Sequence, residues 1–499
     1  MFFSFSLFFC STRFFRVRNR LKYIYNGKES FTDEQLKGKI DALAPVFKEK
    51  FNVADESDVE WLLFSFAPGR INLIGEHVDY MGGWVCPAAL VNGTYILVGR
   101  VKHLKKEQPA KLRFYSSQYR EYFELSDTGP GAGKRVEWTN YVRGAVTLRL
   151  NYLGISIDHR TLRGVCMLIH GDVPMGAGLG TSASFGVALI NALSAVVIED
   201  YKRDSLLGTK RKYKVLPRLP QKERVMVAKQ AQAVEELYCG VKVGIMGQFS
   251  AAMSDRDSFM ILDCSSLTYQ TYPFGPLVGN DHCFLIIDSH VRHDLLGKTK
   301  EVFNAVRSDQ ENAQKKISAN LCKGEVFTLT DLVRSPYNYT TDGNVTQFLR
   351  QCKFFLTESE FLRSLYQVEE QRRTIEFRKV VLADHLSLNE KVKAIGALLN
   401  SSHTGMRDLL KVTIPQIDYI QRAITVQPDD VAGAKMMGGG FGGCVLALVR
   451  KGSVERVTEN MRSAYKKQFG TSCDIYPMEK SGCGMFIAAL SPPSNGAKL

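Results

Sequence analysis

The segment 67–84, APGRINLIGEHVDYMGGW, carries four charged or titratable side chains within ten residues: Arg70, Glu76, His77 and Asp79. They surround an apolar run, INLIG, and charged groups in such a place must be paired or bear a large desolvation penalty. Two carboxylates and a histidine can accept and donate hydrogen bonds to adjacent hydroxyls, which is how polar sugars are held. The alternative is that these residues form only the polar edge of a strand and a turn. That interpretation does not explain how the desolvation of the charged groups is compensated. The segment therefore predicts a sugar-type binding site.

A second segment, PMGAGLGTSASFGVAL (174–189), has the pattern of an anion-binding loop. Gly176, Gly178 and Gly180 let the backbone close around an anion, and Thr181 and Ser182 then open a helix. The first N–H groups and the dipole of such a helix favour phosphate. No lysine follows the glycines as in a Walker A loop, and the spacing is not that of a dinucleotide-binding GxGxxG. Close packing is the alternative explanation of the glycines, but the full pattern favours phosphate binding.

A third segment, GAKMMGGGFGGC (433–444), contains five glycines in the run GGGFGG. So many glycines between a helix and a strand indicate a close backbone approach, either to a ligand or to another loop.

In this order and spacing, the three segments resemble the three signatures of the GHMP small-molecule kinases, and GRINLIGEHVDY resembles the galactokinase signature. Three further stretches agree: WTNYVRGAV (138–146), VKVGIMGQFSAAMSDRDSFMILDC (241–264) and NSSHTGMRDLLKVTIPQID (400–418). The resemblance runs from about residue 60 to residue 490. It implies an α+β, two-lobed GHMP kinase fold with ATP and Mg²⁺ in the cleft. The N-terminal lobe would resemble a ribosomal-protein β-α unit, and the C-terminal lobe would be ferredoxin-like.

The resemblance also implies a role for each site residue. Arg70 would stabilise the charge that develops on the transferred phosphoryl group. Ser182 and Glu235 would hold Mg²⁺, which prefers oxygen ligands. The third glycine segment would close the cleft on the nucleotide side, beside the second. The sugar would contact Glu76, His77, Val78, Asp79 and Phe303. The ATP phosphates would lie against Gly176, Ala177, Gly178, Leu179, Gly180, Thr181 and Ser182.

The chain departs from the resemblance at position 247. The galactokinase loop reads GIMDQ, and its Asp is the general base for the anomeric hydroxyl of the sugar. Here the loop reads GIMGQ, and Gly247 has no side chain. The family tyrosine that points at the sugar aligns with Phe303, which keeps the ring and loses one hydrogen bond. Met437 replaces the usual threonine of the third signature.

Three interpretations of this pattern remain open. The first is a galactokinase, slowed by the missing base, that phosphorylates the 1-hydroxyl of galactose or of an N-acetylated relative. The second is an inactive galactose and ATP sensor, and the third is a non-functional relict. General-base assistance is worth about 10²–10⁴-fold, whereas positioning and charge stabilisation carry most of phosphoryl transfer. The intact ATP and sugar segments argue against the relict, and the resemblance favours the enzyme.

Charge and cysteine content exclude other classes. The net charge is +14, but residues 1–28 and 202–224 supply 13 of these charges, so the rest of the chain is nearly neutral. A basic groove for nucleic acid is therefore not expected. The 11 cysteines are scattered without a C-x-x-C pair, which indicates reduced thiols rather than disulfides or a zinc site.

The elements that position the site follow from hydrophobic patterning. TSASFGVALINALSAVVIE predicts a long buried helix, and CMLIH, SFMILDC, CFLIIDSHV and GCVLALV predict strands. Residues 305–400 are expected to be mainly helical. The predicted domains are an extension (1–30), an N-terminal kinase domain (31–275) with a basic insertion at 202–222, a C-terminal kinase domain (276–490) and a flexible tail (491–499). We expect a monomer that binds a sugar and ATP, with neither nucleic acid nor membrane as a partner.

The two ends of the chain carry the sequence features that bear on the location of the protein in the cell. The apolar run at the N-terminus stops after about ten residues, too short to cross a bilayer. Residues 1–25 are Arg-rich and contain no acidic residue, and we expect them to be an import peptide, an unstructured extension or the result of a misassigned start codon. The final tripeptide, AKL, matches the small–basic–Leu pattern that a peroxisomal import receptor reads. The alternatives are thus a peroxisome or glycosome and the cytoplasm.

Overall fold

The computed structural model describes residues 31, 33–106, 111–127, 138–198, 213–215, 218–292, 298–321 and 327–490. The predicted extension 1–30, most of the insertion at 202–222 and the tail 491–499 lie outside the described residues. Within the described ranges, every helix is too short or too polar to span a bilayer.

The largest sheet has seven strands in the order β5-β4-β6-β3-β1-β14-β7. Its long central strands are antiparallel to each other, and β4 and β6 form a parallel pair. The last strand, β14, pairs with β1, so the end of the described chain returns to the sheet that the first strand begins. The proposed division at residue 275 stays a prediction. The strands are β1 (Val59–Asn72), β3 (Pro87–Val101), β4 (Leu112–Ser116), β5 (Glu121–Leu125), β6 (Val165–Gly171), β7 (Tyr213–Val215) and β14 (Phe486–Leu490).

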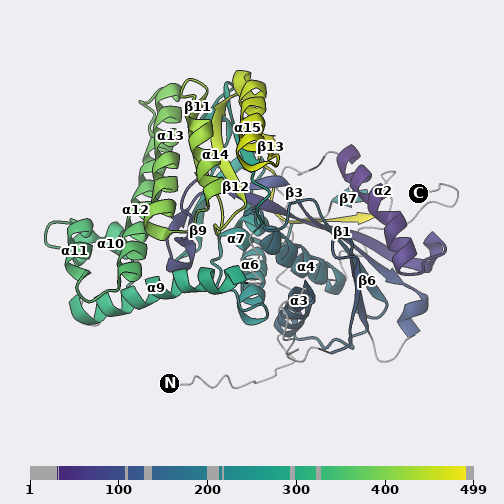
Figure 1. Cartoon of the computed structure of the whole chain (residues 1–499). Helices are drawn as coiled ribbons and strands as arrows, with labels where there is room; N and C mark the ends of the chain where they lie inside the picture. The colour runs from purple at the N-terminus through teal and green to yellow at the C-terminus, as the bar shows by residue number, and fades with distance from the viewer. Residues whose placement is uncertain are drawn as a thin grey trace.

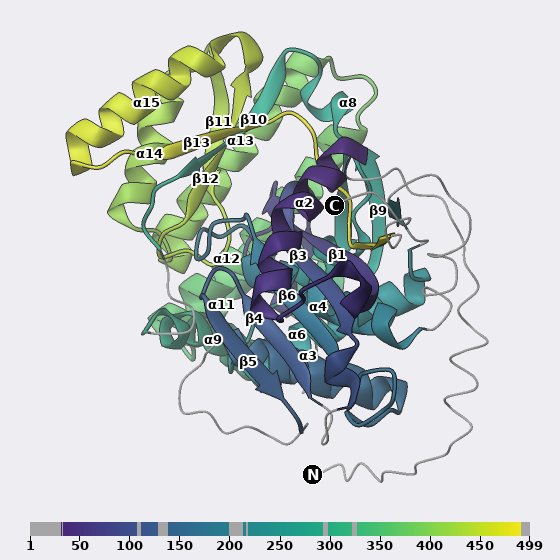
Figure 2. The same cartoon turned by 90° about the vertical axis from the view of Figure 1, so that its right-hand side faces the viewer.

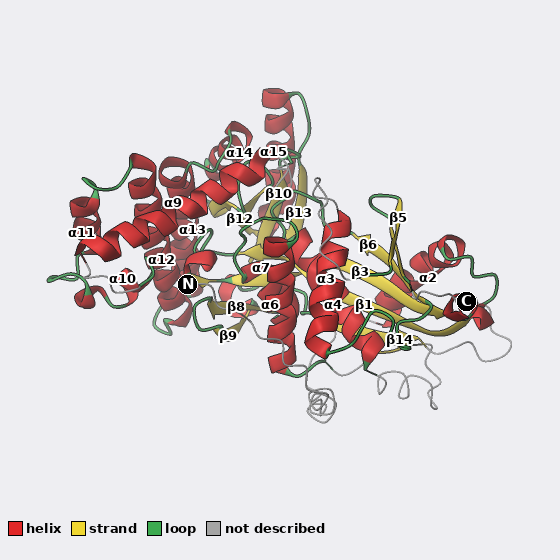
Figure 3. Cartoon of the chain, turned by 90° about the horizontal axis from the view of Figure 1, so that it is seen from below, coloured by secondary structure: helices red, strands yellow, loops and turns green. Residues whose placement is uncertain are grey.

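Side-chain alternation along β1 gives this sheet two apolar faces. Phe64 and Phe66 pack against α2 (Asp33–Lys50), whereas Leu63 and Ala67 pack under α3, α4 and α6. Figure 3 shows α3, α4 and α6 along one face and α2 on the other. The buried helix predicted after the glycine loop is confirmed as α4 (Thr181–Val197), and its neighbours are α3 (Trp138–Leu153), α6 (Gln221–Leu237) and α7 (Met246–Met253).

A second sheet lies at the other end of the molecule, with α14 and α15 beside it (Figure 2). Its strand order is β11-β12-β10-β13, and all its pairs are antiparallel. A small sheet, β2-β8-β9, is the third. The strands are β11 (Val431–Met436), β12 (Cys444–Arg450), β10 (His282–Asp288), β13 (Asp474–Met478), β2 (Trp84–Val85), β8 (Ser258–Asp263) and β9 (Thr268–Pro273). The helices beside them are α8 (Gly275–Val278), α13 (Leu388–Gly405), α14 (Pro415–Thr425) and α15 (Val454–Phe469).

The chain between β10 and β11 is mainly helical over 305–400, as the sequence predicts. It contains α9 (Lys298–Leu321), α10 (Asp331–Arg334), α11 (Val345–Cys352) and α12 (Glu358–Leu382). Thr357 and Glu360 form a capping box that fixes the start of α12. Figure 1 shows α9 running from these outer helices towards α6, so it bridges the two parts of the molecule.

The expected α+β class is confirmed, and the predicted strands appear as β6, β8, β10 and β12. The run INLIG is not a strand throughout, because β1 ends at Asn72 and the chain then enters the turn that carries the charged residues. Leu73 and Ile74 are buried in the second core, which pins the start of that turn.

Candidate active site

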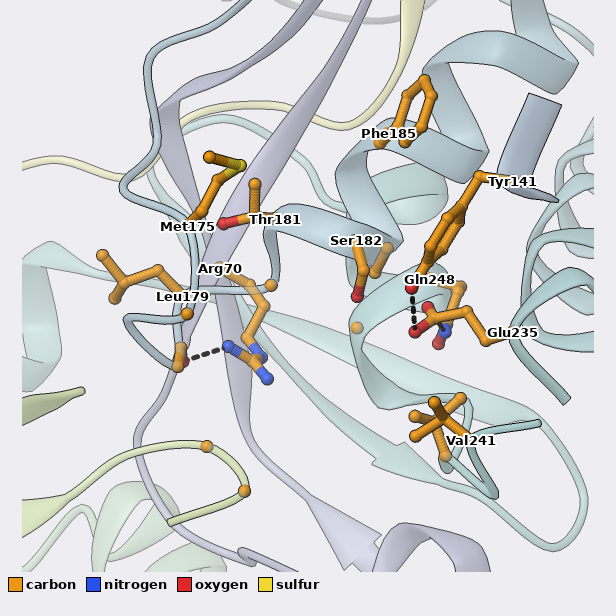
Figure 4. Close-up of a pocket in the computed structure, with 18 of the residues that line it drawn as sticks. Arg70, Tyr141, Met175, Leu179, Thr181, Ser182, Phe185, Glu235, Val241 and Gln248 are labelled. Carbon is orange, nitrogen blue, oxygen red and sulfur yellow. Dashed lines mark hydrogen bonds between the residues drawn. The ribbon is translucent and has the colours of Figure 1, made fainter. Parts of the chain in front are cut away.

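The three glycine-containing segments meet around one cavity of about 640 Å³ (Figure 4). Arg70 enters it from β1, the loop 176–180 and the start of α4 form one wall, and α6 and α7 form another. Two predicted site residues, Val78 and Ala177, are fully buried behind the wall and do not line the cavity. The predicted residues that line it are Arg70, Glu76, His77, Asp79, Gly176, Gly178, Leu179, Gly180, Thr181, Ser182, Glu235, Gly247 and Phe303.

Arg70 ties the strand to the glycine loop. Its backbone N–H donates to the Leu179 carbonyl at 2.8 Å, and its Nη1 donates to the Gly178 carbonyl. Burial lowers the pKa of this guanidinium, while the carboxylates of Glu76 and Asp79 oppose the shift. Since an arginine starts from a pKa above 12, it stays charged at neutral pH. The cavity thus contains a fixed positive charge beside the glycine loop.

The glycine loop has the conformation that its sequence requires. Gly176, Gly178 and Gly180 all have positive φ, between 65° and 75°, which other residues rarely adopt. A Cβ at Gly178 would also lie 2.7 Å from the Met437 carbonyl. The third segment therefore packs backbone against backbone on the second, and its Gly438 also lines the cavity. The side chain of Met437 is buried in the core, and nothing in the structure explains why it replaces threonine.

The start of α4 offers donors to an anion. Gly180 precedes the helix without a side-chain cap, so the first backbone N–H groups face the cavity region without a capping acceptor. The Thr181 hydroxyl is engaged by the loop itself, because it donates to the Pro174 carbonyl at 3.0 Å. Ser182, the second helical residue, points towards Glu235 (Figure 4).

Glu235, on α6, is a buried carboxyl with three polar neighbours. Gln248 Nε2 donates to its Oε1 at 2.8 Å, and the Tyr141 hydroxyl lies 3.5 Å from its Oε2. Burial raises the pKa of Glu235 to about 7, against hydrogen bonds from Ser182, Gln248 and Tyr141. Such a carboxyl gains strongly from a bound cation. Among the described residues, no cluster of three or more His, Cys, Asp and Glu side chains suits a metal, so a cation here would need other ligands as well.

Glu76 joins the first segment to the third. Lys435 Nζ donates to Glu76 Oε1 at 2.8 Å, and both side chains have an exposed fraction of 0%. The Gly438 N–H donates to the same oxygen at 3.1 Å, and Asn72 donates to the other. Removing one partner of a buried pair costs about 3–5 kcal/mol. Lys435 was missed from the sequence, because only the fold brings these two positions together.

His77 and Asp79 sit in a strained, buried turn. His77 has φ of 56°, a conformation that is uncommon outside glycine and clusters at functional sites. Burial lowers the pKa of His77 to about 4, so its ring is neutral. Burial raises the pKa of Asp79, but the Met246 N–H donates to its Oδ2 at 3.1 Å and favours the charged form. The ring of Phe303 lies 5.5 Å from that of His77 and closes this side of the cavity.

Side chains of helix α12 hold this turn through hydrogen bonds to the backbone of the turn. Tyr366 donates to the Glu76 carbonyl at 3.0 Å, Gln367 donates to the His77 carbonyl, and Glu370 accepts from the Gly75 N–H at 2.9 Å. All three side chains are fully buried. The sequence contains no signal for them, because a polar helix face normally indicates solvent exposure.

Gly247 is the second residue of α7, and it lines the cavity. Its φ is not positive, so the backbone accepts an L side chain. An added Cβ would meet one group within 4 Å, the Ala183 Cβ at 3.0 Å. The position is therefore tight, but a shift of a few tenths of an ångström would admit a side chain.

The far end of the cavity is aromatic, which the sequence did not indicate. Tyr119 and Trp138 stack at 5.9 Å with an interplanar angle of 10°, and Tyr141 and Phe185 lie 5.7 Å apart. All four rings line the cavity. A planar heteroaromatic group fits such a wall.

Comparison with known proteins gives a consistent result. The chain matches the galactokinase galactose-binding signature over residues 46–100, the GHMP kinases N terminal domain over 140–255 and the GHMP kinases C terminal region over 385–467. It is 30% identical over 436 residues to the galactokinase of Pasteurella multocida, covering 86% of this chain and 95% of that protein. Identity to the galactokinase of Fusobacterium nucleatum is 29% over 443 residues, or 88% and 97% of the two chains. The structure is similar to Lactococcus lactis galactokinase complexed with galactose, with a TM-score of 0.69 and 27% identity over 90% of this chain and 99% of that one.

Proposed function

The chain belongs to the galactokinase family, and on that premise we propose that it transfers the γ-phosphoryl group of ATP to the 1-hydroxyl of galactose. One observation carries the proposal: a single cavity joins the glycine loop, Arg70 and the buried turn of Glu76, His77 and Asp79. The inactive-sensor interpretation is not supported by the comparisons, because the relatives bear the name galactokinase.

We place ATP along the glycine wall. Its phosphates would accept from the N–H groups of residues 176–182, where the positive-φ glycines and the start of α4 favour an anion. Its adenine would lie against the aromatic end at Tyr119 and Trp138. The γ-phosphate would then face Arg70, which is bonded to the glycine loop and lines the same cavity as the residues proposed for the sugar.

Mg²⁺ fits the pair Ser182 and Glu235. The Glu235 carboxylate and the Ser182 hydroxyl would be oxygen ligands of the kind that a hard cation takes, and the nucleotide would complete the set. A bound cation would also offset the burial that raises the pKa of Glu235. The bound ion would neutralise charge on the phosphates of ATP.

The sugar would lie on the opposite side, against His77, Asp79 and Phe303, with Glu76 and Val78 forming the supporting turn. Its 1-hydroxyl oxygen attacks the γ-phosphorus, the bond from that phosphorus to the bridging oxygen breaks, and ADP leaves with the electron pair. Arg70 stabilises the charge on the moving phosphoryl group. The hydroxyl proton has no carboxylate to accept it at Gly247, so it leaves to water or a phosphate oxygen. We therefore expect a slow reaction.

A panel of hexoses tests the substrate assignment. Purified protein with ATP and Mg²⁺ should release ADP with galactose well above the rate without sugar. N-acetylgalactosamine and glucose serve as comparison substrates, and a higher rate with either one would move the assignment to that sugar. A panel in which no hexose increases ADP release would overturn the proposed activity.

We predict that Ser182→Ala and Glu235→Gln each weaken nucleotide binding in the presence of Mg²⁺ by about tenfold or more, which corresponds to ~1.4 kcal/mol. Ser182→Ala would remove an oxygen ligand of the ion, and Glu235→Gln would replace a charged oxygen ligand by a neutral amide oxygen. Calorimetric titration with ADP, with Mg²⁺ and with EDTA, measures the effect, which should vanish in EDTA. Ser194→Ala, on the same helix but bonded to the Ile190 carbonyl, is the matched control. Wild-type affinity in both variants would refute the assignment.

We also propose that residues 497–499 direct the protein to a peroxisome-type organelle, on the match of AKL to the small–basic–Leu pattern. A fluorescent protein fused to the N-terminus should be punctate and should become diffuse when these three residues are deleted. Puncta that persist after the deletion would contradict the prediction.

A further inference from the structure

One face of α9 is bonded to the loop that leads to Gly247. Lys300 donates to the Cys239 carbonyl at 2.9 Å, and Asn304 both donates to the Gly240 carbonyl at 3.1 Å and accepts from the Lys242 N–H at 3.0 Å. Arg307 Nη1 donates to the Lys242 carbonyl at 3.1 Å. Lys300, Asn304 and Arg307 are here called the α9 clamp. In each of these hydrogen bonds the partner is a backbone group of the loop. Their spacing of four and three residues puts them on one face of the helix.

The loop in turn seats Asp79. A Cβ at Gly244 would overlap the Asp79 carboxylate, so the loop backbone lies directly against that side chain. Two residues on, the Met246 N–H donates to Asp79 Oδ2. A displacement of residues 239–243 would therefore be transmitted within a few residues to the Asp79 carboxylate.

The same helix face also reaches the sugar side directly. Phe303 lies between Lys300 and Asn304 in the sequence, and its ring packs on His77 and, at 6.4 Å, on Tyr80. The far part of α9 is anchored to α12, where Arg363 pairs with Asp309 at 2.6 Å and Lys316 pairs with Glu360 at 2.7 Å. One helix thus fixes both His77 and Asp79 relative to α12.

We propose that the α9 clamp is a positioning device for the sugar: it holds the loop so that Asp79 meets the hexose hydroxyls while Phe303 holds His77. This rests on the proposed function, because it takes these residues as the sugar side of the cavity. The three clamp side chains do not line the cavity, and their bonds end on the loop rather than on residues 176–182, so nucleotide binding should depend on the clamp less than galactose binding does.

Asn304→Ala removes two bonds of the clamp and should weaken galactose binding about tenfold in calorimetry. It should also speed amide exchange in residues 239–246, while ADP affinity with Mg²⁺ falls much less than galactose affinity. Asn304→Asp keeps the acceptor for the Lys242 N–H and should recover part of the affinity. Asn320→Ala, on the same helix but bonded to the Lys316 carbonyl, is the matched control and should have no effect. If Asn304→Ala does not fold, Lys300→Met removes a single bond and should act in the same direction.

The outcomes separate the clamp from the activity. Wild-type protein that binds galactose, with Asn304→Ala binding it equally tightly, overturns the clamp and leaves the proposed function standing. Wild-type protein that does not bind galactose overturns the proposed function and the clamp with it. Loss of ADP affinity in Asn304→Ala, in step with galactose affinity, would show a general structural role and also contradicts the clamp.

Discussion

Replacing Gly247 by aspartate is expected to raise kcat/KM for galactose about 100-fold, the lower end of what a positioned general base contributes. The backbone permits the change, since Gly247 has ordinary φ and its added Cβ meets only Ala183. A carboxylate at the second residue of α7 is also favoured by the helix dipole. Steady-state kinetics with galactose measures the gain, and ADP affinity should barely change because the resemblance assigns a carboxylate at this position to the sugar hydroxyl.

Gly247→Asn is the control for this gain. Asparagine has nearly the same size and requires the same adjustment of Ala183, but it cannot accept the proton, so its rate should not rise. An aspartate variant that folds, binds both ligands and gains no rate would show that other departures, Phe303 foremost, limit the reaction. Equal gains from aspartate and asparagine would point to packing instead of base catalysis.

Arg70→Ala is expected to lower kcat about 1,000-fold, because loss of one preorganised donor to a developing anion costs about 10²–10³-fold, and more when the donor is an arginine that stabilises phosphoryl transfer. The effect is best measured in the Gly247→Asp protein, whose higher rate leaves room for the loss. Thermal unfolding and ADP titration check the fold, since Arg70 also bonds to Gly178.

Arg70→Lys separates charge from geometry. Lysine keeps a positive charge near Glu76 and Asp79 but lacks the planar fork that reaches both the loop and a phosphate, so its loss should be smaller than that of alanine. A kcat for Arg70→Ala within a few-fold of its parent, in a folded protein, would remove Arg70 from the proposed chemistry.

The sequence located most of the cavity because each of its walls is a short local pattern. The glycines at 176, 178 and 180 have positive φ, and Ser182 follows at the start of a helix, so the glycine wall of the cavity is recognisable from a few residues. The crowded charges from Arg70 to Asp79 are equally local. Helix α4 and strands β6, β8, β10 and β12 were predictable for the same reason, since each is a continuous apolar run.

Features that depend on distant partners were not predictable. Lys435 and Glu76 are 359 residues apart, and their ion pair exists only because the third segment folds over the first. Glu370 and Tyr366 bind backbone groups of the turn. Because their partners are not side chains, complementary residue types in the sequence do not indicate these contacts. The pairing of β14 with β1 was also not predictable, because the predicted domains are consecutive segments and this pair joins the two ends of the described chain.

The most direct test of a phosphoryl transfer to the 1-hydroxyl at this cavity is to identify the product. Purified wild-type protein, ATP, Mg²⁺ and galactose labelled with ¹³C at the anomeric carbon are incubated together and followed by ³¹P and ¹³C NMR. We predict galactose 1-phosphate, seen by its phosphorus–carbon coupling, in equal amount to ADP and above the level of Arg70→Ala protein. A wild-type protein that binds both ligands, yet forms no more galactose 1-phosphate than Arg70→Ala protein over a prolonged incubation, would contradict it.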